Sequence, residues 1–132
     1  MRVFLDANIL FSAAKSDGAI RELLKRLQKG RHLLLSSDYA IEEARRNIAA
    51  KYPETATELE ALLTTVEQIP SAQMPAGLSV QLPEKDEVIL GAAICGHCDL
   101  LVTGDRRHFG EYYGKTFANV TVLAPSMVVS YL

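Results

Sequence analysis

The chain has little of what marks several large classes of protein. Its 132 residues include no tryptophan and only two cysteines, too few for a disulfide framework. No apolar run reaches the roughly 18 residues of a membrane-spanning helix. Asp6 interrupts the N-terminal segment before the core of a signal peptide could form. We therefore expect a soluble cytoplasmic protein with no membrane contact.

An excess of positive charge is also missing. The formal net charge is −2, so the composition lacks the basic footprint that draws proteins onto nucleic acids. Bound divalent cations would reverse the local sign wherever acidic residues act as metal ligands. With 48% apolar residues, the chain has the size and composition of a single domain, residues 1–132, with its own core.

Short apolar runs alternate with amphipathic segments along the chain. The runs predict buried parallel strands at 2–5, 32–35, 100–103 and 120–123, with a short edge strand at 66–69. Helical periodicity predicts helices that include residues 20–27, 41–48, 59–66 and 86–97, and a short last helix at 126–132. In the helix at 86–97, the small Gly91 and Ala92 predict a close approach to the sheet. Together these patterns predict an α/β fold, a parallel sheet with helices on both faces.

Acidic residues follow the ends of these strands, where open parallel sheets bind their ligands. Asp6 ends the first strand, Glu43 lies early in the helix after the second, Asp86 opens a later helix, and Asp105 follows the strand at 100–103. Each alone is explained as a helix cap, a solvated charge or a turn former. Capping explains the set less well, because Asp6 begins no obvious helix. Oxygen ligands favour Mg²⁺ or Mn²⁺, and the chemistry that follows is phosphoryl transfer to water.

Four motifs carry a resemblance to a known family. They are Phe4-Leu5-Asp6-Ala7-Asn8, Ser37 with Glu43, the segment 85–90, and Leu101-Val102-Thr103-Gly104-Asp105. In order and spacing they resemble the PIN-domain family over essentially the whole chain. The resemblance implies a Rossmann-like sheet with strand order 3-2-1-4-5. It also implies Mg²⁺- or Mn²⁺-dependent cleavage of single-stranded RNA that leaves 5′-phosphate and 3′-hydroxyl ends.

The resemblance also implies roles for single residues. Four acids match the catalytic, metal-binding positions of the family: Asp6, Glu43, Asp86 and Asp105. Three further residues match supporting positions: Asn8, Thr103 and, with a less defined role, Asp99. The loop before Asp86 lacks an aspartate that several relatives have, which leaves open whether one or two metals bind.

Basic residues near the same rim are candidates for contacts with the RNA backbone, although solvated surface charge explains each of them equally well. They are Arg45, Arg46, Lys51, Arg106 and Arg107. Many small members of the family that this chain resembles are VapC-type toxins. The implied partners are therefore single-stranded RNA, a small antitoxin protein and a second copy of the chain, with a role in RNA processing as the alternative to a toxin.

Other functions compete with this interpretation. Cys95-Gly96-His97-Cys98 has the C-x-x-C spacing of disulfide oxidoreductases, but it ends a predicted helix, whereas a helix N-terminus is what activates such a thiol. The histidines offer no matching pair for a zinc site. An aspartyl-phosphate phosphatase could use Asp6 as its nucleophile, but Asn8 cannot supply the acid which that chemistry needs. A non-catalytic PIN scaffold that binds RNA or protein would not need all four acids.

Overall fold

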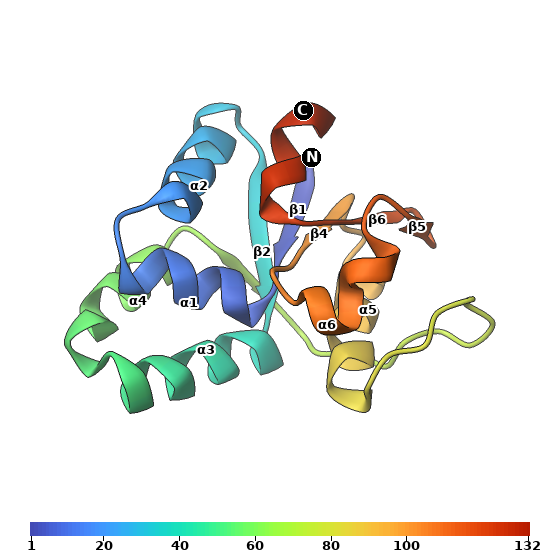
Figure 1. Ribbon diagram of the computed structural model, residues 1–132, viewed down its shortest axis with the longest axis horizontal. Coiled ribbons are helices and arrows are strands. Elements are labelled where there is room, and N and C mark those ends of the chain that lie inside the picture. Colours follow the sequence, from blue (N-terminus) through green and yellow to red (C-terminus); the bar gives the residue numbers. More distant parts are fainter.

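A six-stranded sheet forms the centre of the computed structural model, which describes residues 1–132 (Figure 1). Five strands are parallel: β1 (Arg2–Leu5), β2 (Leu33–Ser37), β3 (Glu67–Ile69), β4 (Leu100–Val102) and β6 (Val120–Leu123). The sixth, β5 (Thr116–Phe117), pairs antiparallel with β6, and the spatial order is β3-β2-β1-β4-β6-β5. The predicted order is confirmed for the parallel strands. The edge strand β5 is an addition, because two residues are too short for a periodic signal.

Helices cover both faces of the sheet, as predicted. Figure 1 shows α1 to α4 gathered on one side of the central strands and α5 and α6 on the other. Their bounds are α1 (Ala7–Lys15), α2 (Ala19–Lys29), α3 (Asp38–Lys51), α4 (Ala56–Leu63), α5 (Glu84–Cys95) and α6 (Arg106–Phe109). Three segments are 3₁₀-helical: η1 (Pro53–Thr55), η2 (Gly110–Tyr112) and η3 (Pro125–Tyr131), the last where a short helix was expected. None of the helices has the length and apolar character that crossing a bilayer requires.

Helix α1 corrects one expectation from the sequence, because Asp6 does begin a helix. The backbone of Asp6 is extended, with φ −68° and ψ 161°, and its side chain accepts a hydrogen bond from the Ala7 amide. Helix α1 is packed against α2, α3 and α4, and five of its residues are buried: Ala7, Ile9, Leu10, Ala13 and Ala14. Only one residue separates β1 from α1, so the apolar Ile9, Leu10 and Phe11 directly continue the apolar run of the strand, and a short continuous run of this kind does not distinguish helix from strand.

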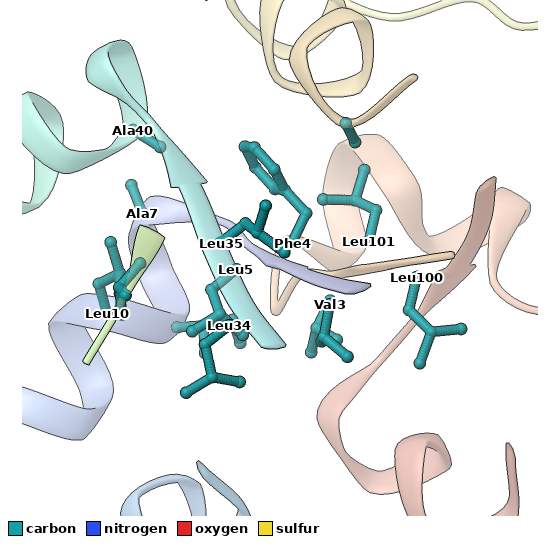
Figure 2. Close-up of a cluster of buried hydrophobic side chains, with 14 of the residues drawn as sticks. Val3, Phe4, Leu5, Ala7, Leu10, Leu34, Leu35, Ala40, Leu100 and Leu101 are labelled. Atoms are coloured by element: carbon teal, nitrogen blue, oxygen red, sulfur yellow. The ribbon is translucent and has the colours of Figure 1, made fainter. Parts of the chain in front are cut away.

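The core forms where neighbouring parallel strands align their side chains. Val3 lies in register with Leu34 and Leu100, and the next residue, Phe4, lies in register with Leu35 and Leu101. Successive residues of a strand point to opposite faces, so each of these two rows packs beneath a different layer of helices. Figure 2 shows the two rows pointing away from each other on either side of the strands. Both layers join one cluster of 33 buried residues, which holds the strand ends in a fixed arrangement.

Gly91, in the middle of α5, is approached closely by backbone. A Cβ atom at this position would lie 2.3 Å from the carbonyl oxygen of Ala72 and 2.7 Å from the amide nitrogen of Met74. The atoms nearest to Gly91 thus belong to the segment that leads from β3 to α5, and this segment crosses directly over the helix. The predicted approach of α5 to the sheet involves Ala92, which is buried, and α5 does contact β2 and β4.

Replacing Gly91 by alanine should destabilise the fold. Alanine favours a helix by about 1 kcal/mol relative to glycine, but overpacking against atoms that cannot rotate away costs about 1–3 kcal/mol or more. We expect Gly91→Ala to lower the free energy of unfolding, measured by chemical denaturation. Gly110→Ala is the matched control, because its Cβ would meet its nearest neighbour, Cβ of Arg106, at 3.9 Å. A Gly91→Ala protein as stable as the wild type would contradict the close approach.

Candidate active site

The carboxylate of Asp6 lies at the carboxyl end of β1 and is only 3% exposed. Its Oδ1 accepts a hydrogen bond from the Ala7 amide at 2.7 Å, and its Oδ2 accepts one from Thr103 Oγ1 at 2.8 Å. The amide group of Asn8 donates a longer bond, 3.4 Å, to the same Oδ2. These contacts join the ends of β1 and β4 and fix the orientation of the carboxylate before any ligand arrives.

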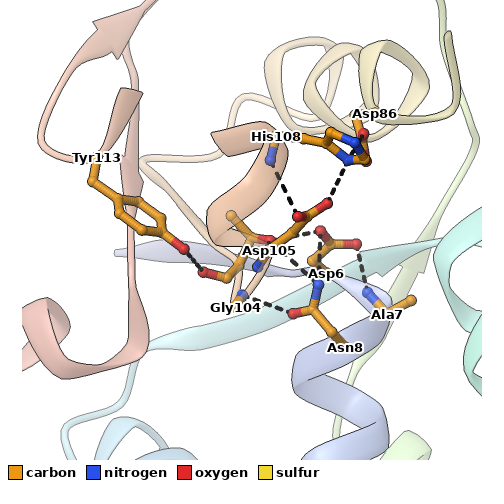
Figure 3. Close-up of polar contacts among 9 residues, drawn as sticks. Asp6, Ala7, Asn8, Asp86, Gly104, Asp105, His108 and Tyr113 are labelled. Atoms are coloured by element: carbon orange, nitrogen blue, oxygen red, sulfur yellow. Dashed lines mark hydrogen bonds and ion pairs between the residues drawn. The ribbon is translucent and has the colours of Figure 1, made fainter. Parts of the chain in front are cut away.

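The turn from β4 to α6 is held from two sides. Asn8 Oδ1 accepts a hydrogen bond from the Gly104 amide at 2.8 Å, and the Tyr113 hydroxyl donates to the carbonyl of Thr103 at 2.8 Å. The Asp105 amide donates to Thr103 Oγ1 at 3.1 Å. Thr103 and Asn8, both predicted as supporting residues, therefore connect the carboxylate of Asp6 to the turn that carries Asp105. Figure 3 shows Asn8 between Asp6 and Gly104 of this turn.

A compact group of possible metal ligands consists of Asp86, Asp105 and His108, whose ligand atoms all lie within 4.8 Å of one another. His108 Nδ1 lies 2.8 Å from Asp105 Oδ2 and 2.9 Å from Asp86 Oδ2 (Figure 3). The hydrogen bond of this ring nitrogen goes to Asp105, so Asp86 Oδ2 is buried without a hydrogen-bond partner. A buried carboxylate oxygen that accepts no hydrogen bond, beside two further ligand groups, suits a divalent cation.

Two pKa shifts show that negative charge is costly at this rim. The pKa of Asp6 is raised to about 6, mainly by burial, against the opposing hydrogen bonds from Thr103 and Ala7. The charges of Glu43 and Asp86 raise it further. The pKa of Asp86 is also raised, first by burial and then by the charge of Asp105, although His108 lowers it. A bound cation would relieve this strain, because it favours the ionised form of each carboxylate.

The four predicted acids thus meet at one end of the sheet, but not equally closely. Asp86 and Asp105 belong to the compact group. Asp6 stands beside it, and Glu43, half-buried on α3, is close enough for its charge to act on both Asp6 and Asp86. Their catalytic roles remain predictions.

His108 is the residue of this site that sequence reasoning missed. No two of the three histidines have the spacing of a zinc site, so the sequence pattern gives no hint of a histidine ligand. His108 is the third residue after Asp105, at the start of α6. Asp105 Oδ1 caps this helix by accepting a hydrogen bond from the His108 amide at 3.2 Å. The i, i+3 spacing was the available signal, but a four-residue helix is too short to be recognised by periodicity.

Asp99, predicted as a supporting acid, does not join the site. It directly precedes β4, and its Oδ2 accepts a hydrogen bond from the Arg2 amide at 2.7 Å. This places Asp99 at the amino ends of β1 and β4, whereas Asp6 and Asp105 follow the carboxyl ends. Its carboxylate instead satisfies a backbone donor at the opposite end of the sheet.

The basic residues predicted to contact RNA fall into two groups. Arg45 forms two hydrogen bonds with Glu60 of α4, at 2.9 and 3.1 Å, which raise the pKa of Arg45. Its charge therefore already has a partner. Arg46, Lys51, Arg106 and Arg107 are exposed, and the last two follow Asp105 directly. Lys51 is the last residue of α3, so the prediction that it lies near the rim is wrong.

The cysteine pair lacks the surroundings of a redox centre. Cys95 is the last residue of α5, so it lies at the negative end of the helix dipole. Cys98 is buried, and burial raises the pKa of its thiol to about 11. A thiol that stays protonated near neutral pH is a poor nucleophile. The alternative of a C-x-x-C redox protein is therefore disfavoured.

Comparison with known proteins identifies one family. The sequence model of the PIN-domain family matches residues 2–107 of this chain. One similar structure is VapBC2 from Rickettsia felis bound to a DNA fragment from the promoter, with a TM-score of 0.66, 19% identity, and coverage of 94% of this chain and 98% of that chain. A search of curated proteins found no match.

Two further structures share the fold. Mycobacterium tuberculosis VapC20, a toxin that cleaves the sarcin-ricin loop, has a TM-score of 0.56 and 12% identity over 80% of this chain and 91% of that one. FitAB bound to an IR36 DNA fragment has a TM-score of 0.58 and 15% identity over 93% and 94% of the two chains. At these identities the likeness shows the fold alone.

The raised pKa of Asp6 predicts how the stability of the metal-free protein depends on pH. The ordinary pKa of this group is 3.8 and its value in the folded protein is about 6, so between these pH values the folded state binds more protons than the unfolded state. The free energy of unfolding should therefore contain a contribution that is fully present below pH 3.8 and is lost as pH rises through 6. A pKa difference of this size corresponds to about 3 kcal/mol.

Asp6→Asn should remove this dependence. We expect the difference in the free energy of unfolding, variant minus wild type, to increase by about 2–3 kcal/mol between pH 4 and pH 7, because only the wild type loses stability over this range. The measurement is chemical denaturation in EDTA at both pH values, with Asp17→Asn as a control that removes one exposed carboxylate. A difference between wild type and Asp6→Asn that stays constant with pH would show that burial does not perturb this group.

Proposed function

This chain belongs to the PIN-domain family, and from that premise we propose that it is a metal-dependent endoribonuclease that hydrolyses phosphodiester bonds of single-stranded RNA. The observation that carries the proposal is the buried Oδ2 of Asp86, which accepts no hydrogen bond and lies next to the carboxylate of Asp105 and the imidazole of His108. Burying a carboxylate oxygen without a hydrogen bond is costly, so natural proteins retain such an atom where a ligand completes it.

The residues present fit Mg²⁺ or Mn²⁺. Asp86, Asp105 and His108 would hold the ion, with Asp6 beside them. The bound ion would supply positive charge to the scissile phosphate and lower the pKa of a water molecule, so that hydroxide is available near neutral pH. A nitrogen ligand from His108 would favour Mn²⁺ over Mg²⁺, because Mg²⁺ is the harder ion and prefers an all-oxygen shell, whereas Mn²⁺ tolerates one imidazole among oxygen ligands.

The chain's own groups provide orientation and proton transfer. Asp6 keeps one geometry because Ala7 and Thr103 hold both of its oxygens. Glu43 is half-buried at the edge of the site, where it would orient the attacking water or accept its proton. Helices α1 and α5 begin at this rim, and the positive ends of their dipoles favour a bound phosphate.

A toxin of a toxin–antitoxin pair is the biological role that the similar structures favour. One of them is described as a toxin that cleaves the sarcin-ricin loop, and two others as VapBC2 and FitAB assemblies on DNA. A small antitoxin protein is therefore the proposed partner, and a homodimer the proposed assembly. Co-purification with the product of a neighbouring gene would support this role over one in RNA processing.

The first test is cleavage of an unstructured, fluorescently labelled RNA. We expect cutting with Mn²⁺ or Mg²⁺ and none in excess EDTA. Asp86→Asn should reduce the rate by at least about 100-fold, because metal catalysis contributes several kcal/mol. Glu84→Gln is the matched control: it removes an exposed carboxylate from the same turn of α5. Full activity in EDTA would refute the proposal.

The second test measures metal binding without activity. A cation that binds only the folded state adds about 2.7 kcal/mol at a hundredfold excess over its Kd, which should raise the melting temperature of the wild type by several degrees. Asp86→Asn and His108→Ala should lose most of this shift. Asp86→Asn should also melt no lower than the wild type in EDTA, because it removes a buried charge whose pKa is already raised. If both variants kept the full metal-induced rise in melting temperature, the metal would bind elsewhere.

A further inference from the structure

Two aromatic rings and two lysines form a cluster at the far ends of α1 and α3. The rings of Phe11 and Tyr52 are 5.7 Å apart between centroids and inclined by 59°. Lys15 Nζ lies 5.4 Å from the centre of the Phe11 ring and 5.8 Å from that of Tyr52, and Lys51 Nζ lies 5.8 Å from the Phe11 ring. We call these four residues the aromatic–lysine cluster.

The cluster is both anchored and accessible. Phe11 is half-buried and packs against the hydrophobic core, whereas Tyr52 is 37% exposed and both lysines are exposed. Neither lysine forms an ion pair with a carboxylate, in contrast to Arg45, whose charge is satisfied by Glu60. The two ammonium groups are therefore available to phosphate, and the Tyr52 ring is available to a flat ligand.

The cluster lies on a path that begins at the proposed catalytic site. Helices α1 and α3 start beside the carboxylates, pack against each other and run in the same general direction away from the site (Figure 1). Phe11 and Lys15 follow Asn8 at i+3 and i+7, so these three share one face of α1. At 1.5 Å per residue, Phe11 is about 7.5 Å and Lys15 about 13.5 Å from Asp6 along the helix axis, a distance that a few nucleotides can span.

We propose that the aromatic–lysine cluster binds the single-stranded RNA substrate next to the scissile phosphate, with a base stacked on Tyr52 and backbone phosphates on Lys15 and Lys51. Proteins that hold single strands combine aromatic platforms with basic side chains in this way. The inference rests on the proposed ribonuclease function. It also explains how a chain with a net charge of −2 would bind RNA, because the side chains of Lys15 and Lys51, which form no ion pair, lie beyond the carboxylates.

The experiment compares steady-state cleavage of a short unstructured RNA in Mn²⁺ by Tyr52→Leu and by the double variant Lys15→Gln/Lys51→Gln. Loss of one stacked base should raise KM roughly 5- to 150-fold with little change in kcat. Tyr52→Trp should restore binding, since stacking requires a ring and not the hydroxyl. In the double lysine variant, the slope of log affinity against log salt, measured by RNA anisotropy in EDTA, should decrease in magnitude by about 1.4.

Matched controls separate this site from general effects. Tyr131→Leu removes another exposed tyrosine, and Lys25→Gln/Lys29→Gln removes two charges from α2. Two results would overturn the proposed role of the cluster and leave the ribonuclease proposal intact. One is cleavage with an unchanged KM in the Tyr52 and lysine variants, and the other is an equal loss of RNA affinity in the control variants. A wild type that neither cuts nor binds RNA would overturn both.

Discussion

The burial of one carboxylate, that of Asp6, constrains the whole rim of the sheet. A buried carboxylate must be hydrogen-bonded to be tolerated, and the donors come from two places in the fold. Ala7 and Asn8 lie in the first turn of α1, and Thr103 directly follows β4. The backbone amide of Asp6 also donates to the Val102 carbonyl at 3.0 Å, which continues the pairing between β1 and β4. Even so, its pKa stays at about 6, so the hydrogen bonds offset only part of the cost of desolvation.

The rest of the site is positioned relative to this fixed point. Thr103 contacts Asp6 with its hydroxyl and at the same time accepts from the Asp105 amide, so the turn that presents Asp105 is tied to the end of β1. Asp105 in turn holds the imidazole of His108, which reaches across to Asp86 on α5. A chain of short contacts therefore links β1, β4, α6 and α5. Such contacts hold these groups in place without a ligand, and preorganisation of this kind is what the proposed metal-assisted hydrolysis would require.

Helix α1 contributes to three parts of the molecule at once. Its inner side supplies Ile9 and Leu10 to the core. Its first turn supplies the amide that binds Asp6. Its exposed face carries Phe11 and Lys15 away from the site, alongside α3. Because one helix is shared by the core, the carboxylates and the aromatic–lysine cluster, the proposed substrate path has a fixed distance from the proposed cleavage site.

The pattern of the sequence was enough to determine the architecture and the neighbourhood of the acids. Strands in a parallel sheet are buried on both faces and read as continuous apolar runs, and their carboxyl ends lie at one edge. The meeting of Asp6, Glu43, Asp86 and Asp105 at that edge follows from position along the chain. The same reasoning failed for α1, because its apolar residues follow those of β1 after a single residue and hide the boundary between strand and helix, and for β5 and α6, which are too short to show a period.

Only the tertiary structure decided which polar groups touch. Asp99 and Asp105 flank the same three-residue strand, yet they lie at opposite ends of the sheet and only Asp105 joins the ligand group. His108 enters that group through a single turn of helix, and Arg45 is occupied by Glu60 from a different helix. Contacts of a few ångströms between side chains depend on how packed elements are placed in three dimensions. Periodicity along a chain carries no information on that placement.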